Sequence, residues 1–277
     1  MTHSHAEIRA LLQLNGLTPS RALGQNFVGD ANTVRRIARL ARVGRGDRVV
    51  EIGPGLGSLT LALLETGAAV TAVELDRFLL PVLKHIVEPK GATVVQADAL
   101  EVDWRELLGD DGPWVLVANL PYNVATPLVM KLLDEAPMVE RILVMVQREV
   151  GERFAATPGS KAYGAVSVKV AWSADAKVVG KVPPSVFVPQ PNVDSALVLL
   201  GRHAELGDRA ERDAVFALVE AGFATRRKML RNTLAGLVDD ACFASARVEA
   251  TERAERLDLD AWRRLAACRT SNERPPS

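Results

Sequence analysis

The stretch Val49-Val50-Glu51-Ile52-Gly53-Pro54-Gly55-Leu56-Gly57 decides the fold of this chain. A short, mostly apolar run leads into alternating glycines, and a pattern with helical period begins near Ser58. Glycine adopts positive φ without a steric penalty and lets the backbone pass close to a ligand. The stretch therefore predicts a buried strand, a tight ligand-binding turn and a helix.

Apolar runs and helix-period segments alternate from here to about Gln147, which predicts βαβ units and a mostly parallel sheet. The expected strands cover 49–52, 69–73, 93–95, 114–118 and 142–146. The expected helices between them cover 58–65, 78–87 and 127–135. Two further β-rich runs, at 166–172 and 196–200, are expected to complete a seven-stranded sheet whose last strand is antiparallel.

The chain beyond residue 204 carries no strand pattern. It shows four helix-period segments, at 209–223, 225–237, 240–249 and 259–269. Residues 205–207 are interpreted as a linker. The sequence therefore predicts two domains, an α/β domain over 1–204 and a small all-α domain over 205–277.

Composition excludes several classes of protein. The chain has 277 residues, of which 48% are hydrophobic and 25% charged, so it can bury a large core and is neither disordered nor collagen-like. No apolar run is long enough to span a membrane. The two cysteines, Cys242 and Cys268, are too few for a cysteine metal cluster and favour a reducing, cytoplasmic compartment. We expect no metal, and we interpret both cysteines as plain apolar helix residues.

The glycines and the acids that follow them predict a nucleoside cofactor. Glu74 ends the second expected strand, 21 residues after Gly53, and an acid at this spacing can accept hydrogen bonds from both ribose hydroxyls. A dinucleotide requires G-x-G-x-x-G, whereas Gly53, Gly55 and the next glycine are spaced G-x-G-x-G. The pattern resembles motif I of the S-adenosylmethionine (SAM) methyltransferases. Their Rossmann-like fold would place Asp98, after the third strand, where it accepts a hydrogen bond from the adenine amine.

The segment Asn119-Leu120-Pro121-Tyr122 ends the fourth expected strand, and ligand chemistry in open α/β sheets lies beyond such strand ends. The Asn119 side-chain oxygen and the Leu120 carbonyl could hold both hydrogens of an exocyclic adenine amine. Pro121 stiffens the turn, and Tyr122 can stack on a base that has been flipped out. This tetrapeptide is therefore predicted to carry catalysis by positioning and electrostatics.

With these motifs in hand, the sequence resembles the small-subunit ribosomal RNA adenine N6,N6-dimethyltransferases over roughly Ile8 to Arg269. The resemblance is carried by residues 23–30, 51–57, 73–76, 97–100, 119–122, 186–196 and 226–231. It implies SAM as cofactor, with contacts from Asn26, Val28, Gly53, Glu74, Asp98 and Asn119. It also implies that Phe187 flanks the target base opposite Tyr122. The chain departs from the family at supporting positions, with Val28 where Leu and Ala97 where Gly is more usual.

Basic residues predict where RNA binds. The chain balances 34 Lys+Arg against 34 Asp+Glu, but residues 1–46 hold seven arginines against only two acids. A second group is expected at the start of the second C-terminal helix, where several cations can meet several phosphates; it comprises Arg226, Arg227, Lys228 and Arg231. By resemblance, the partner is 16S rRNA within the small ribosomal subunit or its precursor, and we expect a monomer.

Two alternatives stay open at this point. A large-subunit rRNA adenine methyltransferase of the antibiotic-resistance type would share the fold and reaction, but those relatives usually carry Ile where Leu120 stands and lack the basic signature at 226–231. A non-catalytic nucleic-acid-binding or assembly factor on the same fold is the other. The complete set of Glu74, Asp98, Asn119 and Tyr122 favours an active enzyme.

Overall fold

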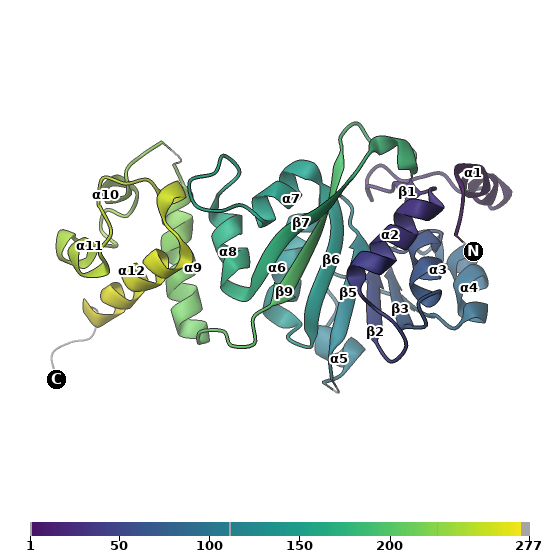
Figure 1. The fold of residues 1–277 in the computed structure, drawn as a ribbon, viewed down its shortest axis with the longest axis horizontal. Coiled ribbons are helices and arrows are strands. Elements are labelled where there is room, and N and C mark those ends of the chain that lie inside the picture. Colours follow the sequence, from purple (N-terminus) through teal and green to yellow (C-terminus); the bar gives the residue numbers. More distant parts are fainter. Residues whose placement is uncertain (1, 111, 226, 273–277) are drawn as a thin grey trace. The chain divides into compact units, whose positions relative to one another are not determined.

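The computed structural model describes residues 2–110, 112–225 and 227–272, and its elements can be followed in Figure 1. The chain divides into two compact units. One comprises Met1–Gly151 and Ala176–Arg202, and the other Glu152–Asp175 and His203–Ser277. The segment Glu152–Asp175 thus groups with the helical C-terminal residues, although the sequence boundary placed it in the α/β part.

The first unit is built on a seven-stranded sheet in the order β4-β3-β2-β5-β6-β9-β7. Its strands are β2 Arg48–Ile52, β3 Ala69–Glu74, β4 Thr93–Gln96, β5 Trp114–Asn119, β6 Val139–Gln147, β7 Ala174–Val182 and β9 Ser195–Arg202. The pairs β2–β3, β3–β4, β2–β5 and β5–β6 are parallel, and β9 runs antiparallel to β6. A mostly parallel, Rossmann-like sheet is therefore confirmed, and the strands expected between 49 and 146 all form.

Helices precede and separate the strands of this unit. They are α1 His5–Leu14, α2 Ala31–Ala41, α3 Ser58–Leu64, α4 Leu80–Val87, α5 Trp104–Leu108, α6 Ala125–Glu135 and α7 Arg148–Phe154, with short 3-10 turns η1 Glu88–Lys90 and η2 Pro184–Val186. Helices α2 and α3 pack on the sheet through Val34, Ile37 and Leu63, which join Val117 and Leu143 in one buried cluster. Burial of this apolar surface holds the strand ends, and the turns that follow them, in fixed positions.

The strand predicted at 166–172 is wrong. This segment belongs to helix α8 Ala165–Ser173, and the sixth strand in chain order of the sheet, β7, begins only afterwards. The Ser167 hydroxyl accepts a hydrogen bond from the Gly164 N–H and donates to the Arg153 carbonyl, which starts the helix. Val168 and Trp172, four residues apart, then face one apolar cluster. A run rich in β-branched residues suggested a strand, but tertiary packing overrode that preference.

The second unit is helical and has its own core. Besides α8 it contains α9 Arg209–Phe223, α10 Leu230–Thr233, α11 Asp240–Ala246, η3 Ala254–Arg256 and α12 Leu259–Asn272. The predicted helix over 225–237 is reduced to the single turn of α10, because the Leu230 and Arg231 N–H groups donate to the carbonyls of Glu252 and Ala250 in another loop. The helices predicted at 209–223 and 259–269 form.

Cys242 and Cys268 form a disulfide between α11 and α12, with Cα atoms 5.6 Å apart. Both cysteines lie on helices, as predicted, but they are not plain apolar residues, because they are bonded to each other. Their separation of 26 residues carries no spacing signal, and only the packing of the two helices brings them together. Within the described ranges, no helix has the length and apolarity that a bilayer crossing requires.

A second, two-stranded sheet pairs β1 Phe27–Val28 with β8 Phe187–Val188 in antiparallel register. The Gly29 N–H extends this pairing by donating to the Val186 carbonyl at 2.8 Å. The sequence gives no hint of strands this short. The pairing ties the segment before α2 to the segment before β9, and it closes one side of the functional site.

Candidate active site

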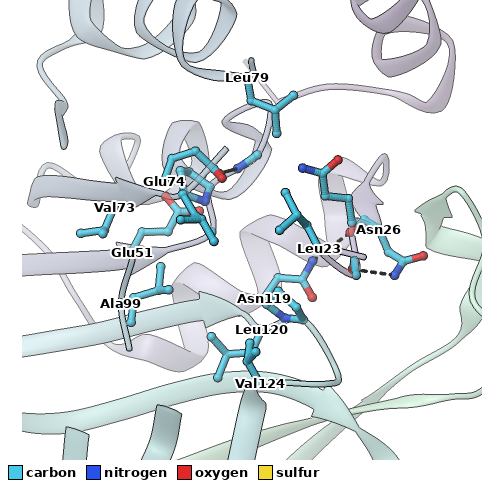
Figure 2. A pocket seen from close by; sticks show the side chains of 18 of the residues that line it. Leu23, Asn26, Glu51, Val73, Glu74, Leu79, Ala99, Asn119, Leu120 and Val124 are labelled. Atoms are coloured by element: carbon cyan, nitrogen blue, oxygen red, sulfur yellow. Dashed lines mark hydrogen bonds between the residues drawn. The ribbon is translucent and has the colours of Figure 1, made fainter. Parts of the chain in front are cut away.

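A cavity lies at the C-terminal ends of β2, β3, β4 and β5 (Figure 2). Its volume of about 180 Å³ is more than ten times the roughly 10–15 Å³ that one water molecule needs. Backbone of the glycine loop, two buried carboxyl groups and apolar side chains line it together. Mixed linings of this kind suit a small organic ligand with a few polar groups.

The glycine loop after β2 forms one wall. Gly53 and Gly55 have φ of 66° and 60°, in the left-handed region that favours glycine. A Cβ at Gly55 would lie 2.8 Å from two ring carbons of Phe27, closer than a side chain allows. Both glycines line the cavity, so their backbone is the surface that a ligand meets.

Glu74 lies at the end of β3, buried and oriented by the backbone. Its Oε2 atom accepts a hydrogen bond from the Gly55 N–H at 3.0 Å, and its Oε1 atom accepts one from the Asp76 N–H at 2.9 Å. Burial raises the pKa of Glu74, while these two hydrogen bonds oppose the rise. A carboxylate offers about four acceptor positions, so the backbone hydrogen bonds leave acceptor capacity for the hydroxyls of a ligand.

Glu51, the residue before the last one of strand β2, is a candidate site residue that the sequence analysis did not include. It is 1% exposed, it lines the cavity, and its Oε2 atom has no hydrogen-bond partner within the described residues. Burial raises the pKa of Glu51 to about 8, the Thr60 side chain opposes the rise, and the charge of Glu74 adds to it. A buried carboxyl oxygen without a partner is costly, so Oε2 of Glu51 is open to a hydrogen-bond donor or a positive charge of a ligand. The sequence does carry a signal for Glu51, since this acid stands two residues before Gly53, the first glycine of the loop.

Asp98 follows β4 and lines the cavity, but part of its carboxylate is already used. Its Oδ1 atom accepts a hydrogen bond from the Leu100 N–H at 2.8 Å, which shapes the loop as an Asx turn. Its Oδ2 atom is the group that remains for a ligand. Leu75, which the sequence-based site also omitted, lines the same cavity with 48% of its surface exposed. It adds an apolar surface to the lining next to Glu74.

Asn119 ends β5 with its side-chain amide oriented by a neighbour. Its Nδ2 atom donates to the Asn26 carbonyl at 3.0 Å. Only the NH₂ end of the amide can donate to a carbonyl, so the opposite end, Oδ1, is the acceptor left over. The Leu120 N–H donates to Met145 on β6, and no described residue donates to the Leu120 carbonyl. The turn therefore presents two oxygen acceptors at the cavity.

Pro121 and Tyr122 complete this turn. The Pro121 carbonyl accepts hydrogen bonds from the Val124 and Ala125 N–H groups, which leads the chain directly into α6. Tyr122 is partly buried, and its hydroxyl oxygen lies 2.8 Å from the Ser195 hydroxyl oxygen. Burial raises the pKa of Tyr122, so the phenol is neutral at physiological pH. All four predicted catalytic residues of 119–122 line one cavity with the predicted cofactor residues.

The N-terminal segment covers the cavity. Asn26 and Val28, both expected to contact the cofactor, are among its lining residues. The Gln25 side chain donates to Asp76 at 2.7 Å, and the Asn26 carbonyl accepts from Asn119, so the segment is fastened to the ends of both β3 and β5. Figure 2 shows Asn26 and Asn119 facing each other across this bond.

Phe187 is not brought to the cavity. It lies in β8, is 3% exposed, and packs in the same buried cluster as Val28, its partner in the small sheet. It is absent from the described residues that line the cavity. Its expected role of flanking the target base opposite Tyr122 stays a prediction.

The predicted RNA-binding cations lie in the second unit. Arg226 lies outside the described residues. Arg227, Lys228 and Arg231 are exposed, but the first two precede α10 rather than begin a helix. Across the described residues, no group of three or more His, Cys, Asp or Glu side chains is arranged so that it could hold a metal ion.

A glycine loop after the first parallel strand, an acid at the end of the next, and a polar turn after the fourth define a Rossmann-like methyltransferase. Similarity to known proteins identifies the family within this class. A family model for ribosomal RNA adenine dimethylase matches residues 17–268. This chain belongs to that family.

Relatives and solved structures agree with the family. The ribosomal RNA small subunit methyltransferase A of Leifsonia xyli subsp. xyli is 52% identical over 274 residues, which cover 95% of this chain and 96% of that protein. The crystal structure of the 23S rRNA methyltransferase ErmE is similar at a TM-score of 0.71 and 27% identity, covering 88% of this chain and 99% of that one. A dimethyladenosine transferase from Plasmodium falciparum shows the same fold at a TM-score of 0.70 and 23% identity, covering 86% and 95%.

Proposed function

We propose that this protein uses SAM to dimethylate the N6 amines of adjacent adenosines near the 3′ end of 16S rRNA during assembly of the small ribosomal subunit. The observation that carries the proposal is the pair of unused acceptors, Asn119 Oδ1 and the Leu120 carbonyl, at the edge of the cavity that Glu51 and Glu74 also line. An adenine amine has two hydrogens to donate, one to each acceptor.

The residues of the cavity fit SAM. Glu74 would hold the ribose hydroxyls through its remaining acceptor positions. Asp98 would accept from the adenine amine, Leu75 would contact the adenine face, and Glu51 would face the positive charge of the amino acid end. Asn26 and Val28 would cover the cofactor, over the backbone of Gly53 and Gly55. Bound SAM would supply an electrophilic methyl group next to the Asn119 turn.

On the substrate side, this chain orients the amine rather than removing its proton. Two hydrogen bonds from the amine, to Asn119 and to the Leu120 carbonyl, would draw the nitrogen lone pair out of conjugation with the ring. Pro121 fixes the direction of that carbonyl, and Tyr122 would stack on the base. Each transfer would leave S-adenosylhomocysteine and a methylated, cationic nitrogen that is strongly acidic and gives up one proton to water. After the first transfer the neutral nitrogen keeps one hydrogen, so one of the two acceptors can orient it again.

Binding to the RNA is proposed to rest on exposed cations, which supply affinity and salt dependence but no reading of sequence. Arg227, Lys228 and Arg231 are three of them. The proposed partner is 16S rRNA in the small subunit or its precursor, bound by a monomer in the cytoplasm. In that compartment, glutathione would reduce the Cys242–Cys268 disulfide to two thiols.

Sequence identity favours this substrate over the large-subunit alternative. The fold is shared with a 23S rRNA methyltransferase, so the fold itself does not decide between them. Identity is 52% to a small subunit methyltransferase A but 27% to ErmE. A catalytically inactive binding factor is disfavoured because none of the polar groups needed for chemistry is missing from the cavity.

The test is transfer of labelled methyl from SAM to unmethylated small subunits, large subunits and free rRNA, with the product bases resolved by mass. Dimethyladenine in small subunits alone supports the proposal, whereas label in the large-subunit RNA would reassign it. Asn119→Ala is expected to lose about 100-fold or more in rate, the size of removing one preorganised polar group from an active site. Asn32→Ala, which removes an exposed amide from α2, is the matched control and is expected to retain the activity.

The RNA-binding proposal has a separate test in salt. Lys228→Ala and Arg231→Ala are each expected to weaken RNA binding and to reduce the slope of log affinity against log salt by about one. Methyl transfer at saturating RNA should be unchanged. Variants that lower the rate without changing the salt slope would contradict a phosphate contact.

A further inference from the structure

Tyr122 is fastened to a strand two positions away in the sheet. The turn that carries Tyr122 follows β5, and its hydrogen-bond partner Ser195 is the first residue of β9, with β6 lying between the two strands. Ser195 is 0% exposed, and the two hydroxyl oxygens are 2.8 Å apart. A fully buried hydroxyl therefore meets the far end of the one aromatic ring on the proposed catalytic turn.

Ser195 is itself held rigidly by backbone pairing. It stands opposite Gln147 in the antiparallel register of β6 and β9. The Arg148 N–H continues the pairing by donating to the Asp194 carbonyl at 3.0 Å. The Ser195 backbone is thus fixed at the end of a ladder of seven residue pairs, and its hydroxyl acts as a stationary anchor.

The Tyr122 ring is anchored at both of its ends. At one end, the Pro121 carbonyl caps the start of α6 and holds the Tyr122 backbone within a tight turn. At the other end, the phenol meets Ser195. Because burial raises the pKa of Tyr122, the phenol keeps its proton and the hydrogen bond persists through neutral pH. A ring set in place before its ligand arrives loses less entropy when the ligand binds.

We propose that Ser195 is a positioning residue that sets the plane of the Tyr122 ring for stacking on the target adenine. This inference rests on the proposed function, because it concerns the same turn. Ser195 does not touch the substrate or the cofactor; it acts through Tyr122. It therefore affects the steps that involve RNA and leaves SAM binding unchanged.

The ring can be observed without any substrate. The chain has two tyrosines, Tyr122 and Tyr163, so ring-labelled tyrosine gives two sets of NMR signals, assigned with Tyr163→Phe. Tyr163 donates its own hydrogen bond to the Leu257 carbonyl in the helical unit and serves as an internal reference. Ser195→Ala is expected to shift or broaden the Tyr122 signal alone. An unchanged Tyr122 signal would overturn the proposal, whether or not the protein is an enzyme.

Kinetics supply the second readout. Ser195→Ala is expected to lower kcat/KM for the RNA substrate by about three- to tenfold, the value of one buried hydrogen bond, with KM for SAM unchanged. Tyr122→Phe keeps the ring and removes the same bond, so it should match. The double variant should be no worse than either single one, since both remove one interaction. Independent, multiplying losses would refute the coupling.

Ser167→Ala is the matched control. Ser167 is also a buried serine, 2% exposed, and it donates to the Arg153 carbonyl at 2.6 Å in the second unit. Its loss is expected to reduce stability while kcat/KM and the Tyr122 signal stay as in the wild type. A wild-type protein that transfers no methyl would count against the proposed function, whereas an active Ser195→Ala protein with normal kinetics would count against the role of Ser195 alone.

Discussion

Binding of SAM is expected to release a proton from Glu51. In the free protein, burial raises the pKa of this carboxyl to about 8, so at pH 6.5 it is almost wholly protonated. A cation bound beside it favours the carboxylate and returns the pKa toward its ordinary value near 4.5. Each SAM bound at pH 6.5 should then release about one proton.

The same shift fixes the pH dependence of affinity. Between pH 6 and pH 7 the free carboxyl stays mostly protonated and the bound one stays ionised, so the Kd for SAM should fall about tenfold over that single unit. The α-amino group of the ligand keeps its charge in this range. Affinity therefore rises from pH 6 to pH 7, and the rise ends near pH 8, where Glu51 of the free protein is ionised and the α-amino group of the ligand loses its proton.

Calorimetry in buffers of different ionisation enthalpy measures the protons directly, from the slope of the observed binding enthalpy. Glu51→Gln should abolish both the proton release and the tenfold pH dependence, while Glu106→Gln, an exposed acid on α5, should preserve both. S-adenosylhomocysteine keeps the amino group and lacks the sulfonium charge. Release of a proton with both ligands would assign the contact to the amino group.

Two results would refute this reasoning. One is a binding enthalpy that does not depend on the buffer. The other is a Glu51→Gln protein that still releases a proton, which would move the titration to the second buried acid, Glu74, whose pKa is also raised by burial.

Other parts of the structure predict further outcomes. Glu51 also binds its proton more tightly in the folded than in the unfolded chain, so its contribution to stability is complete below about pH 4.5 and is lost toward pH 8. The loss amounts to about 1.4 kcal/mol per pH unit. Urea unfolding of the cofactor-free protein should show this fall in the free energy of unfolding, and Glu51→Gln should flatten it. Gly55→Ala should be at least about 1 kcal/mol more destabilising than Gly16→Ala, because both have φ near 60° but only the first Cβ meets the Phe27 ring; equal losses would argue against the contact. Arg202→Leu should lower the free energy of unfolding by about 2–3 kcal/mol, because its guanidinium donates to four carbonyls at the end of α6 and the start of β6; an unchanged urea midpoint would contradict this.

Much of the site could be predicted because its residues follow strand ends. The carboxyl ends of parallel strands meet at one edge of a sheet, so the loop at Gly53, the acid Glu74 and the turn at Asn119 had to lie near one another once the strands were recognised. That inference needs only the order of elements and the residue types after each. It does not need the contacts of any side chain.

What could not be predicted depends on contacts across the fold. The Tyr122–Ser195 bond joins residues 73 apart, and the disulfide joins two helices whose packing no local pattern encodes. The helix at 165–173 was mistaken for a strand because a short apolar run fits either period. Glu51 was visible in the sequence, but its lack of a partner, which gives it a chemical role, is a property of the packed core.

The pairing of β1 with β8 has a consequence for the order in which this protein is made. The cavity needs Phe27 and Val28 as its cover, and these residues are held by Phe187 and Val188, some 160 positions later. A chain growing from its N-terminus exposes the glycine loop long before that partner has been synthesised. Until then, the first two-residue strand has an unsatisfied edge, and contacts of such long range form late. The cavity is therefore completed near the end of the synthesis of its own unit, so a nascent chain would gain no stability from the proposed cofactor during most of its growth.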